Sequence, residues 1–286
     1  MNIGRTVPRH RVFQCTIVRS ISELQGVAGL RAWWVFRGQS SCFRLTPTLE
    51  RECPDRKDWI AAERDEITRL KQQLTGRENV PDEDDHLGWL GRLRHAGRPV
   101  RLLDFTRRLP VAVYFATCEE SDSMPSIWAI DGYRLTIAWK RWITPPSEPL
   151  YIGSPYVNWA EFNQIYPSRD GAHAAMLVEP RAPNRRQELQ EALFLTGLNM
   201  RYTLEENLFG AFGHELCSVI PKRKADGMLT GPLGVNLKPL QGDGRRRIMD
   251  AHLIRIDLQI PRPEIIAYLE SEGVSNQTLG FQPDPC

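Results

Sequence analysis

Arg37, Gly38 and Gln39 follow an apolar run that is expected to be a strand, so they lie where a sheet meets solvent. The guanidinium group of an arginine is a rigid fork of donors, and this geometry suits a phosphate group. A glycine beside it lets a ligand approach the backbone closely. The same arginine could instead cap a helix C-terminus or pair with a buried carboxylate. These residues therefore leave a binding role and a structural role both open.

A second polar group, Asp104 and Thr106, stands between an apolar pair and the apolar residues 109–118, which are expected to form a helix. Either side chain could cap that helix, because an N-cap oxygen accepts a free backbone N–H. A helix N-terminus with a hydroxyl beside it is also a ready site for a phosphate or a ribose. The pattern is compatible with both roles.

A third polar group, residues 185–191, leads directly into the apolar residues 192–196, which are expected to form a strand. An amide or carboxylate at the mouth of a strand could hold a ribose hydroxyl and stabilise a developing positive charge. A helix end with solvated charges is the alternative. Gln190 is the candidate here. Strand alternation predicts Glu191 on the opposite face, and Glu188 on the face of Gln190 if the strand begins that early.

The spacing of apolar residues predicts an α+β chain, with a mixed, largely antiparallel sheet as its core and helices at its flanks. Strands are expected at residues 11–18, 33–37, 126–130, 174–179, 192–196 and 252–258. Helices are expected after a capping signal at residues 20–23 and at residues 57–74, 82–94, 109–118 and 261–271. Five prolines interrupt residues 139–172, which are expected to be irregular apart from a helical turn at residues 158–165.

The composition is that of an ordinary globular protein, with 286 residues, 41% of them hydrophobic and 25% charged. A net charge of +2 gives no overall field that would indicate a nucleic-acid partner. Basic clusters at residues 222–224 and 245–247 indicate either solvated loops or an edge that contacts phosphates. Residues 221–244 are rich in Gly, Lys and Pro and are expected to form a mobile loop.

The six cysteines are sparse and none has Cys-x-x-Cys spacing, which favours reduced thiols and a cytoplasmic protein. The N-terminus lacks the apolar region of a signal peptide. No apolar stretch approaches the ~18 residues that cross a bilayer, so no membrane association is expected. His214-Glu215 lacks a second histidine four positions after the first, so no metal site is predicted.

Together these residues resemble the FRG-domain family, named for a Phe-Arg-Gly motif. Its members carry Phe/Tyr-Arg-Gly-Gln followed by Leu-x-Pro-x-Leu-x-Arg, then a pattern similar to Gln-His-Tyr-Gly-Leu-Pro-Thr-Arg-Leu-Leu-Asp-Trp-Thr ahead of Ala-Leu-Tyr-Phe-Ala, and later Arg-Ile-x-x-Gln-x-Gly-x-Phe. The matching positions in this sequence are Arg37, Gly38, Gln39, Pro47, Arg51, His95, Gly97, Pro99, Arg101, Asp104, Thr106, Phe115, Arg186, Gln190 and Phe194. The resemblance implies a single FRG-type domain over residues 1–286. Its motif core would be residues 18–196, with residues 197–286 as a C-terminal extension packed on it.

The sequence departs from the family pattern at several positions beside the presumed site. Arg94 stands in place of a glutamine and Ala96 in place of an aromatic residue. Arg98 precedes the proline where a leucine is usual, Phe105 replaces a tryptophan and Ala192 replaces a glycine. The two arginines add positive charge near the site and weaken any role assigned to the usual residues there.

The order of Arg37, Thr106 and Gln190 or Glu191 resembles that in ADP-ribosyltransferases. These enzymes often place an arginine on an early strand, a Ser/Thr motif on a middle element and a Glu or Gln at a later strand. The resemblance implies an ADP-ribosyltransferase-like fold and displacement of nicotinamide from NAD. Arg37 would clamp the pyrophosphate, and Thr106 would position the nicotinamide ribose or brace the catalytic acid. Gln190 or Glu191 would hold the ribose 2′-hydroxyl as an oxocarbenium ion forms.

These patterns define two sets of candidate residues. The residues expected to take part in catalysis are Arg37, Asp104, Thr106 and Gln190. The residues expected to bind NAD are Arg37, Gly38, Gln39, His95, Arg101 and Tyr114. We expect the four catalytic candidates to converge on one cleft. If the reaction needs a carboxylate where Gln190 supplies only an amide, Asp104 is the first candidate.

The resemblance further implies a macromolecular acceptor, either a protein or a nucleic acid. Genes for such domains are often linked with mobile elements and phage defence, which suggests a toxin or defence effector with a regulatory or antitoxin partner. Two alternatives stay open at the level of sequence. One is a non-catalytic module that binds a nucleotide or nucleic acid through the same arginines. The other is an interaction scaffold in which Asp104 pairs with Arg101 or Arg37.

Overall fold

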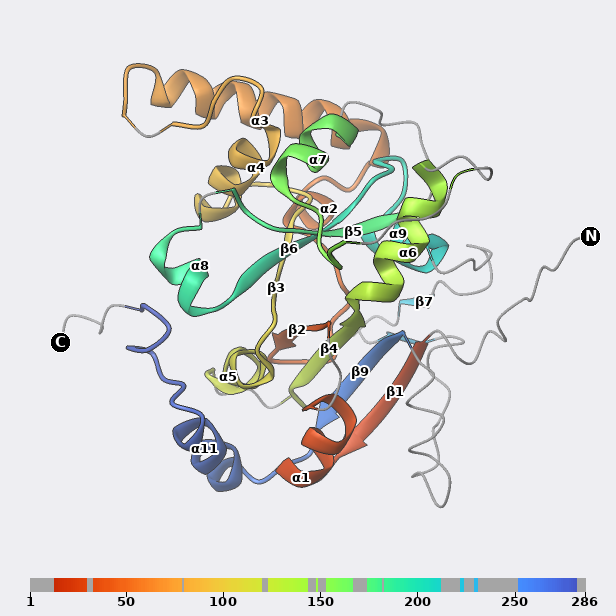
Figure 1. Ribbon diagram of the computed structural model, residues 1–286, viewed down its shortest axis with the longest axis vertical. Helices are drawn as coiled ribbons and strands as arrows, with labels where there is room; N and C mark the ends of the chain where they lie inside the picture. Colours follow the sequence, from red (N-terminus) through yellow and green to blue (C-terminus); the bar gives the residue numbers. More distant parts are fainter. Residues whose placement is uncertain are drawn as a thin grey trace, which may run out of the picture.

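The structure is a computed structural model that describes residues 13–29, 33–78, 80–119, 123–143, 148, 153–166, 174–181, 183–211, 222–223, 229–230 and 252–281. Within these ranges one sheet has the strand order β1-β9-β4-β2-β3-β6-β5 (Figure 1). Its strands are β1 (Phe13–Val18), β2 (Trp34–Gln39), β3 (Leu103–Thr106), β4 (Ser126–Asp131), β5 (Ala175–Val178), β6 (Ala192–Gly197) and β9 (Leu253–Leu258). Every neighbouring pair in this sheet is antiparallel except β1 with β9. The predicted α+β class with a largely antiparallel sheet is confirmed.

Helices cover both faces of the sheet (Figure 1). They are α1 (Ile21–Leu24), α2 (Thr48–Glu52), α3 (Trp59–Leu74), α4 (His86–His95), α5 (Leu109–Thr117), α6 (Gly132–Ile143), α7 (Trp159–Ile165), α8 (Arg185–Leu189), α9 (Leu204–Ala211) and α11 (Arg262–Ser271). One face of β1, β9, β4 and β2 packs on α1, α5 and α11. The other face packs on α6 and α9, while α3, α4 and α7 cover the half formed by β3, β6 and β5. In the described part of the chain, no helix is both long enough and apolar enough to cross a membrane.

Local signals in the sequence explain several of these elements. The Ser20 hydroxyl accepts a hydrogen bond from the backbone N–H of Glu23 at 3.2 Å, so the predicted capping signal begins α1. The predicted helical turn at residues 158–165 is α7, and Asn158 caps it by accepting the backbone N–H of Glu161 at 2.9 Å. In both cases the capping residue has a short polar side chain and an extended backbone.

Other elements differ from the prediction. The irregular segment predicted at residues 139–172 is wrong at its start, because α6 runs to Ile143 and the first proline of that stretch comes only after the helix ends. Strand β2 continues through Gly38 instead of ending there. The predicted mobile loop at residues 221–244 lies outside the described residues, apart from a two-strand pairing of β7 (Lys222–Arg223) with β8 (Leu229–Thr230). His214 and the basic residues 245–247 also lie outside the described ranges.

Strand β9 comes from near the C-terminus and lies between β1 and β4. It runs parallel to β1, with Phe13 opposite Leu253, and antiparallel to β4. Leu253, Ile254 and Ile256 are fully buried on the two faces of the sheet. The segment that the family resemblance predicts to be a C-terminal extension therefore contributes an interior strand of the sheet.

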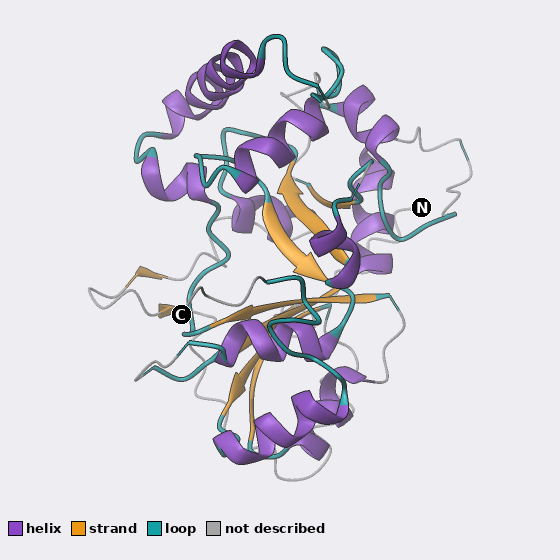
Figure 2. Ribbon diagram, turned by 90° about the vertical axis from the view of Figure 1, so that its left-hand side faces the viewer, coloured by secondary structure: helices purple, strands orange, loops and turns teal. Residues whose placement is uncertain are grey.

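The sheet is split between β2 and β3. These two strands share one residue pair, Phe36 with Thr106, whereas β2 is paired with β4 along its whole length. Figure 2 shows the strands of the two halves running in clearly different directions. Beyond Phe36, the edge of β2 that faces β3 therefore has no strand partner in the described part of the chain, while the other edge stays paired with β4.

Gly38 sits where α5 packs directly against β2. A Cβ atom at this position would lie 1.9 Å from the carbonyl oxygen of Ala112 and 2.7 Å from the backbone nitrogen of Ala116. Both of these contacts are with the backbone of α5, which cannot move aside as a flexible side chain could. The glycine that sequence analysis assigned to ligand approach is thus required for the close approach of a helix.

We expect Gly38→Ala to lower the free energy of unfolding by about 3 kcal/mol, because the methyl group overlaps helix backbone. Gly91→Ala is the matched control, since a Cβ atom there meets no atom within 4 Å and the residue lies inside α4. Alanine in a helix interior is favoured over glycine by roughly 0.5–1 kcal/mol, so the control should gain stability. Urea denaturation of both variants tests this, and a Gly38→Ala protein as stable as wild type contradicts it.

Glu50 is a half-buried carboxyl group beside the N-terminus of α9. It accepts a hydrogen bond from the backbone N–H of Leu204 at 2.6 Å. The pKa of Glu50 is raised to about 8, mainly by burial and also by the nearby carboxylate of Glu205. The Leu204 N–H and Arg44 lower this pKa and offset part of the rise. Glu50 is therefore largely protonated in the folded protein at neutral pH.

We expect Glu50→Gln to become more stable relative to wild type as pH rises from 5 to 9. The ordinary pKa is 4.5, so between about 4.5 and 8 the folded state keeps a proton that the unfolded state loses. In this window the wild-type free energy of unfolding falls with pH, while glutamine stays neutral and still accepts the Leu204 N–H. The gain at pH 9 should be on the order of 3 kcal/mol. Denaturation curves at pH 5, 7 and 9 measure it, and parallel pH profiles would contradict it.

Candidate functional site

A pocket of about 390 Å³ opens at the split between β2 and β3, and we call it the site pocket. Strands β2, β3 and β6 and helices α4, α5 and α8 contribute to its walls. The lining residues are Phe36, Arg37, Gly38, Arg94, His95, Asp104, Phe105, Thr106, Phe115, Arg186, Gln187, Gln190 and Ala192. The structure thus brings Arg37, Asp104, Thr106 and Gln190 together in one pocket, although they lie up to 153 residues apart in the chain (190 − 37).

Arg37 is a buried cation with an unused donor. Its Nη1 donates a hydrogen bond to the backbone carbonyl of Asp104 at 2.8 Å, across the gap between β2 and β3. Its Nε is buried and has no hydrogen-bond partner. Burial lowers the pKa of Arg37 to about 10, against the attraction of Asp104, so the guanidinium stays protonated at neutral pH. A buried donor without a partner is unfavourable, and this one belongs to a side chain that lines the site pocket.

Asp104 pairs with Arg94 on α4. The Arg94 Nε donates to Asp104 Oδ2 at 2.8 Å, and Nη2 donates to the same oxygen. Arg37 contacts only the backbone of Asp104, so the scaffold interpretation named the wrong partners for this carboxylate. The arginine that departs from the family pattern is therefore the one that neutralises Asp104.

The site pocket carries a net positive charge. Three arginines line it, namely Arg37, Arg94 and Arg186, against one carboxylate, Asp104. Burial lowers the pKa of His95 despite the attraction of Asp104, so the imidazole is neutral near pH 7. The Arg186 guanidinium lies over the ring of Phe281, 3.8 Å from its centroid, which fixes it at the rim.

Thr106 holds the backbone around the pocket. Its hydroxyl donates to the carbonyl of Gln190 at 2.6 Å and accepts the backbone N–H of Arg108 at 3.0 Å. The side chain is only 5% exposed. The first bond joins the end of β3 to the turn before β6, and the second orders the start of α5. The helix-capping interpretation is wrong, because the N-cap of α5 is Arg108 and no side chain caps it.

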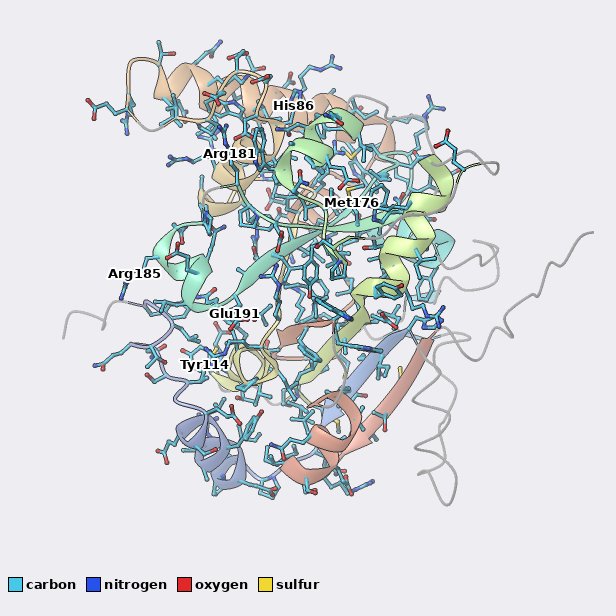
Figure 3. The ribbon with its side chains drawn as sticks, in the orientation of Figure 1. His86, Tyr114, Met176, Arg181, Arg185 and Glu191 are labelled. Atoms are coloured by element: carbon cyan, nitrogen blue, oxygen red, sulfur yellow. The ribbon has the colours of Figure 1, made fainter. Side chains whose placement is uncertain are left out.

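Gln190 and Glu191 lie in the turn between α8 and β6, before the strand begins at Ala192 (Figure 3). Gln190 is the C-cap of α8, and its Nε2 donates to the carbonyl of Leu279 at 3.2 Å. Glu191 has a left-handed backbone, with φ of 45°, and lies 3.8 Å from Arg108 Nε. The prediction that strand alternation separates the two residues is wrong, because neither is on the strand. Among the described residues, Asp104 is the one carboxylate that lines the site pocket.

Arg101 lies outside the site pocket, contrary to its prediction as a ligand-binding residue. It is 6% exposed and forms a buried ion pair with Glu63 on α3, with Nε donating to Oε2 at 2.8 Å. The hydroxyl of Tyr166 donates to the same carboxylate at 3.0 Å. Both partners of this arginine lie far from it in the sequence, so the motif gave no sign that its charge was already neutralised.

Gln39 and Tyr114 also lie outside the lining of the site pocket. The Gln39 Oε1 accepts the indole N–H of Trp128 at 3.1 Å, which holds the end of β2 against β4. Tyr114 is on α5, and its hydroxyl donates to the side chain of Asn276 in the C-terminal segment. Figure 3 shows the labelled Tyr114 beside this segment. Both side chains therefore have structural partners in place of the predicted ligand.

Gln187 lines the site pocket but was not predicted from the sequence as a site residue. It lies on α8, whose start is a capping box: Asn184 accepts the backbone N–H of Gln187, and Gln187 accepts that of Asn184, both at 2.9 Å. The spacing of Asn184 and Gln187 is the sequence signal for such a box, and it would have predicted a helix at residues 185–189 in place of a strand mouth.

The fold and the pocket define an α+β protein with a cationic pocket at a split in its sheet. Within that class, residues 32–124 match the model of the FRG domain. This segment contains β2, β3, α4 and α5, which form the site pocket apart from the wall supplied by α8 and β6. No curated protein and no solved structure gives a significant match to the chain.

Proposed function

We propose that this protein binds NAD in the site pocket and acts as an ADP-ribosyltransferase-like enzyme. The observation that carries the proposal is the buried guanidinium of Arg37, which has an unpartnered Nε at a pocket of net positive charge. A pyrophosphate supplies the negative charge and the acceptor oxygens that this arrangement lacks. Arg94 and Arg186 would contact the same group from α4 and α8.

The proposed reaction displaces nicotinamide from the C1′ carbon of its ribose. The glycosidic C–N bond breaks and its electron pair leaves with neutral nicotinamide. A nucleophile on the acceptor forms the new bond to C1′ and loses its proton to solvent or to Asp104. Asp104 and the Gln190 amide would stabilise the positive charge that develops on the ribose. Thr106 would act as a positioning residue, because its hydroxyl is engaged with the backbone of Gln190 and Arg108.

Binding of the pyrophosphate would also change the partner of Asp104. In the structure Arg94 neutralises this carboxylate. A phosphate oxygen that takes the Arg94 donors would leave Asp104 with a full charge beside the reacting ribose. The acceptor would be a macromolecule, a protein or a nucleic acid, and the role that of a toxin or phage-defence effector held in check by a regulatory partner. This wider role rests on the resemblance to FRG domains.

A non-catalytic nucleotide-binding module is the second candidate. The observation that favours it is the pairing of Asp104 with Arg94, since no other carboxylate among the described residues lines the site pocket. Such a module would use the arginines for binding and would leave the glycosidic bond intact.

One experiment separates these functions. Purified protein is titrated with NAD by calorimetry, and then incubated with labelled NAD with and without cell extract. Binding followed by nicotinamide release and label transfer supports the transferase. Binding without release supports the module. Failure to bind NAD rejects the transferase and any module that binds NAD.

We expect Asp104→Asn and Gln190→Ala to lower nicotinamide release at least tenfold, which corresponds to about 1.4 kcal/mol of transition-state stabilisation each. Glu191→Ala is the matched control, because Glu191 neighbours Gln190 but does not line the site pocket. Its release rate should be that of wild type. If Glu191→Ala alone loses activity, the assignment of the third polar group to Gln190 is wrong.

A further inference from the structure

A second pocket, of about 540 Å³, adjoins the site pocket, and we call it the α4 pocket. Both pockets are lined by His95 on α4 and Gln187 on α8, so these two side chains form the ridge between them. The Asn184 amide lies 3.2 Å from His95 Nε2 and holds the ridge in place. Together the two pockets have a size typical of ligand-binding sites, which span ~300–1,000 Å³.

The wall of the α4 pocket is an uncovered face of helix α4. Leu87, Gly88, Gly91 and His95 all line it, and their spacing places them on one side of the helix. Gly91 leaves the helix backbone bare, because a Cβ atom there would meet no atom within 4 Å, whereas Gly88 is covered by Asp85 and Pro81. Phe194 of β6 also lines the pocket, although only 2% of it is exposed. The open helix backbone at Gly91 leaves room for a flat ring.

We propose that the α4 pocket holds the adenosine of NAD, an inference that rests on the proposed function of the site pocket. The reacting ribose has to lie by Asp104 and Gln190, both of which line the site pocket and not the α4 pocket. Arg37 and Arg94 also line only the site pocket, so the pyrophosphate is held there. The adenosine then has to lie outside the site pocket. The α4 pocket, on the other side of the ridge of His95 and Gln187, is large enough for it.

The ridge suits the passage of such a ligand. Its two side chains are an amide and an imidazole that burial keeps neutral near pH 7, so they add no charge that opposes the ligand. The carboxylates of the α4 pocket are engaged: Asp82 pairs with Arg181 at 2.7 Å, and Asp85 accepts the backbone N–H of Gly88 at 2.9 Å. The α4 pocket therefore combines apolar side chains with polar groups, as sites for small ligands do.

The test fills the α4 pocket from Gly91. A side chain at this position projects into open space, so Gly91→Phe and Gly91→Leu should block the pocket without disturbing the packing of α4. Gly26→Phe is the control for a large added side chain, because a Cβ atom at Gly26 also meets no atom within 4 Å and Gly26 lines neither pocket. Binding of NAD and of nicotinamide mononucleotide, which lacks the adenosine, is measured by calorimetry for wild type and all three variants. Circular dichroism and thermal melts check that each variant is folded.

We expect wild type and Gly26→Phe to bind NAD at least about tenfold more tightly than nicotinamide mononucleotide, or about 1.4 kcal/mol. In Gly91→Phe and Gly91→Leu the affinity for NAD should fall to that for the mononucleotide, which should itself be unchanged. Unaltered NAD affinity in both blocked variants overturns the inference and leaves the proposed function standing. Failure of wild type to bind either nucleotide rejects the proposed function, and the inference with it.

Discussion

Arg37→Met is expected to abolish NAD binding and to raise thermal stability at the same time. The guanidinium is buried with an unpartnered Nε, so the folded protein carries a desolvated charge and an orphaned donor. Methionine fills similar space without either, and replacing buried charge by an apolar side chain of similar volume is often stabilising. The lost bond to the Asp104 carbonyl offsets part of this, which leaves a gain of about 1 kcal/mol. NAD affinity should fall at least about 100-fold, because the charge-assisted hydrogen bonds from the guanidinium to the pyrophosphate are lost.

Calorimetry with NAD and thermal melts of the same preparation measure both effects. Arg37→Lys is the matched control, since it keeps the positive charge and removes the planar fork. Its affinity should lie between those of wild type and Arg37→Met. A scaffold role for Arg37 predicts the reverse pattern, a lower melting temperature with no change in any binding. That outcome would contradict the assignment of Arg37 to a pyrophosphate.

Arg101→Met should produce the largest loss of stability of any substitution considered for this chain. It leaves the Glu63 carboxylate, which is 1% exposed, without its cation inside the core. Removing one partner of a buried ion pair typically costs about 3–5 kcal/mol. Tyr166 still donates to Glu63, but a hydroxyl does not neutralise a charge. Denaturation in urea gives the change in the free energy of unfolding.

The double variant Glu63→Gln with Arg101→Met is the control. Glutamine keeps an acceptor for Tyr166 and carries no charge, so most of the stability should return. NAD affinity of the double variant should equal that of wild type, because Arg101 lies outside the site pocket. Reduced NAD affinity in a fully folded double variant would restore Arg101 as a ligand-binding residue.

The sequence predicted those parts of the fold that depend on local signals. The long apolar face of α3 and the Ser20 cap of α1 are confirmed, because such signals act within a few residues. Strand β3 alternates apolar and polar residues, but it is only four residues long, which is the shortest run in which alternation indicates a strand. The site was predictable in part for the same reason. Polar residues that interrupt apolar runs do meet at the split in the sheet.

Contacts between segments that are distant in the chain could not be predicted from the sequence. Nothing near Arg101 shows that Glu63, 38 residues earlier, neutralises it. Nothing near Gly38 shows that the backbone of α5 lies against it. In both cases a motif residue that was predicted to bind a ligand instead makes contacts within the core. The catalytic roles of Arg37, Asp104, Thr106 and Gln190 stay predictions. Their meeting in one pocket shows where they lie and not what they do.

The position of β9 has a consequence for how this protein is made. Strand β1 is made before the other strands of the seven-stranded sheet, but its partner strand β9 is made last. Until then β4 keeps an open edge that can pair with another chain. Residues 32–124, which match the FRG domain, contain only β2 and β3 of the sheet, and these share one residue pair. The segment that matches the FRG domain is therefore much smaller than the seven-stranded sheet, and a ribosome that stops before residue 253 releases a chain without its finished sheet.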